Sequence, residues 1–143
     1  ELLASNNVCN IYRDFAHAPS KVIATIEAVK QQFPSRKLIG VLELHTYSSL
    51  NKEFMHQYKG ALEKTDTAVV FYSKHALQIK GLPELPESYV VEGFDKKGLL
   101  VMTDKNALEQ WLQAQDYSNT NLVLMSSGNY DGIDLPSFAP TLI

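Results

Sequence analysis

The chain has 143 residues, of which 45% are hydrophobic and 20% are charged, and its formal net charge is −3. These values are typical of one globular domain, and they argue against a disordered tail, a basic nucleic-acid-binding surface and a membrane span. The single cysteine, Cys9, excludes an internal disulfide and a cysteine-rich zinc site. We therefore expect a soluble, cytoplasmic domain with no nucleic-acid or membrane partner. Because the first residue is Glu1 rather than Met, we also expect a fragment of a longer protein.

Short apolar runs and helical periods alternate along the chain. In chain order, the pattern predicts a strand at 8–12, a helix at 19–32, a strand at 37–44, a helix marked by Phe54, Tyr58, Ala61 and Leu62, a strand at 67–72, a surface connection at 81–86, a short helix at 87–95, a strand at 99–103, a helix at 106–115, a strand at 121–126 and a terminal tail at 134–143. The continuous apolar strands are typical of a parallel sheet buried on both faces. The sequence therefore predicts a three-layer α/β/α sandwich formed by residues 1–143 as a single domain.

Ligands of such sheets bind at the carboxyl ends of the strands. Four polar segments follow predicted strands there, namely residues 14–17, 45–49, 73–75 and 126–131. Three of these segments have a simpler interpretation: Asp14 and His17 as caps of the next helix, the 45–49 segment as a solvated loop, and the glycines near 128 as a turn. His56 and His75 are expected on the surface. Glu43 and His45 alone make only a weak metal site, so we predict no metal ligands in this chain.

Several motifs are absent. The sequence contains no Gly-x-x-x-x-Gly-Lys-[Ser/Thr] phosphate loop, no Gly-x-Gly-x-x-Gly fingerprint and no Gly-x-Ser-x-Gly elbow. Self-contained ATP hydrolysis, dinucleotide binding and α/β-hydrolase chemistry are therefore not expected. Cys9 lies within a predicted strand, which disfavours a thiol nucleophile.

The junction Asp14-Phe15-Ala16-His17-Ala18-Pro19, followed by an amphipathic helix and a Leu-Ile-Gly-Val-Leu-Glu strand, resembles the C-terminal domain of the Mur ligases. These ATP-dependent enzymes add amino acids or peptides to UDP-N-acetylmuramic acid precursors of peptidoglycan. The resemblance covers residues 10–133 and implies the Rossmann-like third domain of a three-domain bacterial ligase. It further implies that Asp14 binds the ATP ribose hydroxyls and that His17 lines the same edge. The phosphate loop and Mg²⁺ ligands would lie in the absent central domain, and the UDP-binding site in the absent N-terminal domain.

The resemblance leaves the acceptor open between two kinds of Mur ligase. Phe15, Ala16, and the 125–133 run favour the members that add the tripeptide L-alanyl-γ-D-glutamyl-meso-diaminopimelate, as do Leu42 and Glu43. His45, Tyr47 and Ser48 instead favour the members that add free L-alanine. The two arginines with which the latter are expected to hold the amino-acid carboxylate are replaced by Thr46 and Ser49, and Ala18 departs from both patterns. The implied acceptor-binding residues are His45, Thr46, Tyr47, Ser48, Ser49, Ser127 and Asn129.

We accordingly expect one domain of an ATP-dependent ligase that joins a peptide to UDP-N-acetylmuramate and that is inactive in isolation. The first alternative is the corresponding domain of an L-alanine-adding ligase. The second is a free-standing, non-catalytic α/β ligand-binding module. A phosphate loop upstream in the parent reading frame discriminates a ligase from such a module.

Overall fold

The computed structural model describes all residues, 1–143, and contains one six-stranded sheet of order β1-β2-β6-β3-β4-β5. The strands are β1 (Leu2–Ser5), β2 (Asn10–Asp14), β3 (Lys37–Glu43), β4 (Thr67–Phe71), β5 (Leu100–Met102) and β6 (Thr120–Met125). Only β1 is antiparallel to its neighbour; the other pairings are parallel. The mostly parallel sheet predicted from the sequence is confirmed.

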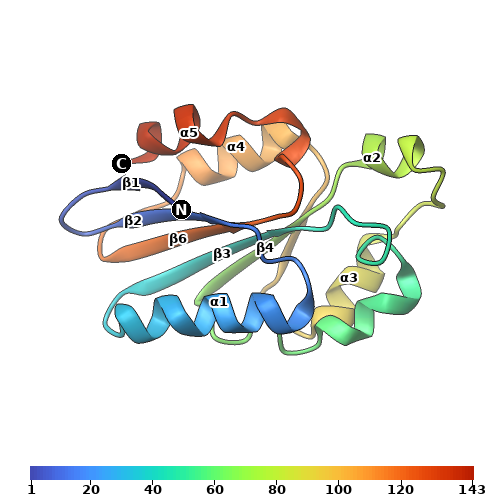
Figure 1. Cartoon of the computed structure of the whole chain (residues 1–143), viewed down its shortest axis with the longest axis horizontal. Coiled ribbons are helices and arrows are strands. Elements are labelled where there is room, and N and C mark those ends of the chain that lie inside the picture. Colours follow the sequence, from blue (N-terminus) through green and yellow to red (C-terminus); the bar gives the residue numbers. More distant parts are fainter.

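Helices cover both faces of the sheet (Figure 1). They are α1 (Pro19–Gln32), α2 (Lys74–Ile79), α3 (Glu87–Phe94), α4 (Lys105–Gln113) and α5 (Leu135–Phe138), with 3₁₀ helices η1 (Lys52–Tyr58), η2 (Tyr130–Gly132) and η3 (Ala139–Leu142). One core of 20 buried residues lies under α1, α3 and η1, and a second of 15 lies under α4 and α5. This is the predicted three-layer sandwich. None of its helices has both the length and the apolar character needed to cross a bilayer.

Four segments differ from the sequence prediction. Helix α2 forms at Lys74–Ile79, where the sequence analysis predicted a polar segment and no helix. The first residues form β1, which pairs with β2 at the sheet edge. The segment predicted as a second α-helix forms η1 and then turns, because Met55 and Tyr58 bury their side chains at three-residue spacing, which a 3₁₀ helix also satisfies. The predicted terminal tail is instead folded onto the second core, where Leu135 and Ala139 are buried. Pro136 and Pro140 are the second residues of α5 and η3, within the first turn, where a backbone N–H has no partner inside the helix.

Candidate functional site

Three of the predicted loops meet at the carboxyl edge of the sheet. Strand β6 lies between β2 and β3, with Met125 in register with both Asp14 and Leu42. The loop after β6 (residues 126–130) is therefore flanked by the junction after β2 (residues 14–19) and by the loop after β3 (residues 45–49). The backbone N–H of Ser126 donates to the carbonyl of Asp14 at 3.0 Å. This hydrogen bond joins the loop after β6 to the junction after β2.

Asp14 has one carboxylate oxygen engaged and the other without a protein donor. Its Oδ1 accepts from the backbone N–H of Ala16 at 2.8 Å, inside the junction. The N-cap residue of α1 is Ala18, with no side-chain cap, so the interpretation of Asp14 as a helix cap is wrong. A cavity of about 510 Å³ opens beside Asp14, lined also by Phe15, Ser126 and Gly128 and by Glu1 and Arg13. The free carboxylate oxygen is thus available to a ligand in this hollow.

His17 is held by its neighbours and also does not cap α1. Its Nδ1 lies 2.9 Å from the carbonyl of Phe15, and its own carbonyl accepts from the Tyr58 hydroxyl at 2.6 Å. Tyr58 is buried and stacks on Phe94 at a centroid distance of 4.8 Å. The junction is therefore anchored to the core beneath η1 and α3.

Glu43 ends β3 with a buried carboxylate that organises the 126–130 loop. Its Oε1 accepts from the Ser126 hydroxyl at 2.5 Å and from the Tyr130 backbone N–H at 2.9 Å. Burial raises the pKa of Glu43 above its ordinary value, and the two hydrogen bonds partly oppose that shift. The sequence analysis considered Glu43 as half of a weak metal pair and as a point of resemblance to the tripeptide-adding ligases, and did not predict this structural role. The structure brings no group of three potential metal ligands together. The sequence feature that could have indicated this role is the position of Glu43, an acidic residue at the end of an apolar strand.

The backbone is unusual in η2, where the 126–130 loop ends. Tyr130, Asp131 and Gly132 all have positive φ, at 53°, 57° and 91°. For the two non-glycine residues this left-handed conformation costs free energy unless surrounding contacts impose it. The buried Tyr130 hydroxyl lies 2.7 Å from the carbonyl of Met125 and 3.0 Å from that of Val41. Together with the bond to Glu43, these contacts hold the loop in one shape.

The 45–49 loop divides into an inward and an outward part. Ser49 is buried, and its hydroxyl donates to the carbonyl of Thr46 at 3.1 Å while accepting from the Thr46 hydroxyl at 3.0 Å. Tyr47 and Ser48 are exposed, and the ammonium of Lys80 lies 4.8 Å from the Tyr47 ring centroid. Tyr47 and Ser48, the outward part, are therefore the residues of this loop that are free to contact a ligand.

The remaining candidates lie in or near this edge. Ser127 has a buried hydroxyl oxygen with no hydrogen-bond partner, whereas Asn129 is exposed and accepts from the backbone N–H of Gly132 at 3.3 Å. Ser73 caps α2 by accepting from Ala76 N, so the fourth predicted segment serves that helix. His56 and His75 are exposed, as predicted.

Comparison with known proteins gives the family. The family model for the Mur ligase glutamate ligase domain matches residues 1–128. A UDP-N-acetylmuramate–L-alanine ligase from Lactobacillus delbrueckii subsp. bulgaricus is 46% identical over 55 residues, which are 38% of this chain and only 12% of that protein.

Solved structures agree on the fold. A domain ascribed to a UDP-N-acetylmuramate:L-alanyl-γ-D-glutamyl-meso-diaminopimelate ligase of Haemophilus ducreyi has a TM-score of 0.69 and 23% identity, with 100% of this chain and 98% of that one covered. A murein peptide ligase from Psychrobacter arcticus has a TM-score of 0.73 and 16% identity, covering 100% of this chain and 30% of that one. The MurF ligase from Thermotoga maritima, solved with ADP, has a TM-score of 0.57 and 16% identity over 97% of this chain and 29% of that one. The chain belongs to the Mur ligase family, and its fold is that of the family's C-terminal, Rossmann-like domain.

Proposed function

We propose that this chain is the C-terminal domain of a three-domain, ATP-dependent ligase that joins L-alanyl-γ-D-glutamyl-meso-diaminopimelate to UDP-N-acetylmuramate in peptidoglycan recycling. The observation that carries the proposal is the meeting of the junction, the 45–49 loop and the 126–130 loop at one edge of the sheet. A nucleotide-facing carboxylate and an acceptor-facing loop thereby lie on either side of a rigid central loop. Such an arrangement orients two substrates without supplying acid–base chemistry of its own.

Asp14 and His17 form the proposed nucleotide edge. The carboxylate oxygen of Asp14 that has no protein donor is suited to accept from ribose hydroxyls, and the adjacent cavity of about 510 Å³ has room for a sugar ring. The ADP in the MurF neighbour, whose chain is matched over 29% of its length by this fold, supports a nucleotide-dependent parent.

Magnesium does not fit the residues of this chain. No three His, Cys, Asp or Glu side chains lie close enough together to hold a metal ion. Of the two carboxylates that line the cavity beside Asp14, that of Glu1 is already paired with Arg13. We therefore assign the metal and the phosphate loop to the central domain of the parent, and the UDP-binding site to its N-terminal domain. We propose a location in the bacterial cytoplasm for this enzyme, since its proposed substrates are ATP and UDP-N-acetylmuramate.

The 45–49 loop supports a peptide rather than a free amino acid as acceptor. Thr46 and Ser49 hydrogen-bond to each other. Neither side chain carries a charge with which to bind a substrate carboxylate. A hydroxyl does not reproduce the planar, bidentate contact of a guanidinium. A tripeptide offers further carboxylates and amides that Tyr47, Ser48 and Asn129 can share in several weaker contacts.

The second candidate is the corresponding domain of an L-alanine-adding ligase. The 46% identity over 55 residues to the Lactobacillus enzyme favours it. A free-standing binding module is the third candidate. The parent gene distinguishes it from a ligase: a phosphate-loop motif encoded upstream supports a ligase, and the absence of such a motif contradicts a ligase.

The test of the proposed ligase role compares the parent protein with the 143-residue chain. The parent, given ATP, Mg²⁺, UDP-N-acetylmuramate and the tripeptide, is expected to release ADP and phosphate and to form the UDP-N-acetylmuramoyl tripeptide. The isolated chain is expected to release no phosphate above a boiled control. Phosphate release by the isolated chain contradicts the assignment of the phosphate loop to another domain.

A further inference from the structure

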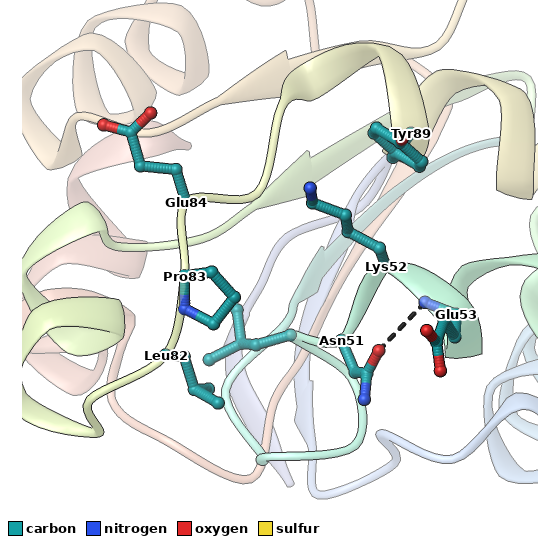
Figure 2. A pocket seen from close by; sticks show the side chains of 8 residues that line it. Asn51, Lys52, Glu53, Leu82, Pro83, Glu84 and Tyr89 are labelled. Atoms are coloured by element: carbon teal, nitrogen blue, oxygen red, sulfur yellow. Dashed lines mark hydrogen bonds between the residues drawn. The ribbon is translucent and has the colours of Figure 1, made fainter.

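Glu43 is the only Asp or Glu side chain of the chain that is buried, with 2% of its surface exposed. The other acidic side chains are at least partly exposed. Figure 2 shows two of them, Glu53 and Glu84, beside a cavity of about 470 Å³, with their carboxylates directed away from the Lys52 ammonium. Burying a carboxylate costs free energy unless hydrogen bonds compensate, so Glu43 must be held by its surroundings.

Hydrogen bonds from the 126–130 loop supply this compensation. Oε1 of Glu43 accepts from the Ser126 hydroxyl and from the Tyr130 backbone N–H, which lie at the two ends of the loop. The Ser126 hydroxyl oxygen in turn accepts from the backbone N–H of Gly128 at 2.7 Å. One buried oxygen therefore holds both ends of the loop directly and the middle of the loop through Ser126.

The loop held in this way contacts both sides of the carboxyl edge. On one side, the Ser126 N–H donates to the Asp14 carbonyl, and Ser126 and Gly128 line the cavity beside Asp14. On the other side, the backbone of Gly128 packs against the His45 ring. A displacement of the loop therefore changes the surroundings of Asp14 and of His45 together.

We propose that Glu43 is a positioning residue for the ligase reaction, which sets the nucleotide side and the acceptor side of the carboxyl edge together by holding the 126–130 loop. The inference rests on the proposed function, in which the nucleotide lies at Asp14 and the acceptor at the 45–49 loop. Glu43 is buried and lines neither cavity beside the loop, so it acts through the loop rather than by touching a substrate. Hydrogen bonds from such supporting residues keep a binding site in its productive geometry.

The test measures the parent ligase with Glu43→Ala and with Glu43→Gln. Alanine removes the acceptor oxygen, whereas glutamine keeps one for Ser126 and Tyr130. We expect Glu43→Ala to raise the KM for ATP and the KM for the amine acceptor, each at least about fivefold, and Glu43→Gln to change each by less than about twofold. Destabilisation alone lowers the number of folded molecules, and hence the apparent kcat, while the molecules that remain folded keep both KM values.

A second variant covers the case in which Glu43→Ala does not fold. Ser126→Ala removes the link between Glu43 and Gly128 but leaves the bond from Tyr130 in place. Because Ser126 lines the cavity on the nucleotide side, its decisive readout is the KM for the acceptor, which we expect to rise about threefold or more.

Glu92→Ala removes an exposed carboxylate of α3 and is expected to leave both KM values unchanged. A rise in only one KM with Glu43→Ala, equal effects of alanine and glutamine, or a lower kcat with both KM values unchanged overturns the role assigned to Glu43. An unchanged acceptor KM in Ser126→Ala also overturns it. The ligase proposal is judged separately, by product formation in the original parent, whichever amine it accepts.

Discussion

The backbone of Gly128 lies directly against the imidazole ring of His45. A β-carbon built at position 128 would stand 2.6 Å from Cγ and 2.8 Å from Nδ1 of that ring. Real β-carbons essentially never approach another atom this closely, so any larger residue at 128 requires the ring to move. The contact packs the loop after β6 against the loop after β3, so a larger residue in one loop requires the other loop to move.

Gly128→Ala is therefore expected to displace His45 and to destabilise the domain by about 1–3 kcal/mol, the usual cost of overpacking. Urea denaturation followed by circular dichroism measures the change in the free energy of unfolding. In a His45→Ala background the same substitution is expected to cost much less, because the obstructing ring is gone. An equal cost in both backgrounds would show that the two residues are not coupled.

The buried carboxylate of Glu43 is expected to make stability depend on pH. Burial raises its pKa in the folded chain above the ordinary value of 4.5, so the folded state binds the proton more tightly than the unfolded state. Its stabilising contribution is then fully present below about pH 4.5 and is lost as the pH rises through the raised pKa. Glu43→Gln retains an acceptor oxygen for Ser126 and Tyr130 but cannot ionise.

The measurement is the free energy of unfolding of Glu43→Gln minus that of the original chain, taken from pH 4.5 to pH 8. We expect this difference to increase with pH, because only the original chain loses stability when the carboxyl group ionises. Glu92→Gln, at an exposed position of α3, controls for the general effect of removing a carboxylate. A difference for Glu43→Gln that stays constant with pH would contradict the buried environment assigned to this side chain.

Asp14→Asn is expected to separate nucleotide binding from local structure. The asparagine oxygen can still accept from Ala16, so we expect the free energy of unfolding to change by less than about 0.5 kcal/mol. Loss of a charge-assisted bond to a ribose hydroxyl is expected to raise the KM of the parent enzyme for ATP at least about tenfold. Steady-state kinetics with varied ATP measure this, and an unchanged KM would leave Asp14 a purely structural part of the junction.

Periodicity was sufficient to predict the elements that carry the fold. Helix α1 begins and ends where its apolar spacing and Pro34 indicated, and the buried runs became β3, β4 and β6. Strand β1 was missed because it is a short, partly exposed edge strand whose pairing with β2 is set only in three dimensions. The 134–143 segment was misinterpreted as a tail because its prolines begin helices as readily as they end them.

The candidate site was predictable in outline but not in its contacts. Since parallel strands end at one edge, the sequence indicated that the segments after β2, β3 and β6 would meet there. The bond from Ser126 to Glu43 and the packing of Gly128 on His45 depend on strand register and strand order, which no local pattern contains. The engagement of Ser49 by Thr46 likewise became visible only with the loop conformation.

The most direct test of the central claim is the choice of acceptor by the parent ligase. With ATP, Mg²⁺ and UDP-N-acetylmuramate supplied, kcat/KM is measured for L-Ala-γ-D-Glu-meso-diaminopimelate and for free L-alanine. Since hydroxyls at Thr46 and Ser49 replace a charge-assisted carboxylate contact worth about 1.5–3 kcal/mol per bond, we expect the tripeptide to be preferred by a factor on the order of a hundred or more. A higher kcat/KM for L-alanine would contradict the account and assign the chain to an L-alanine-adding ligase.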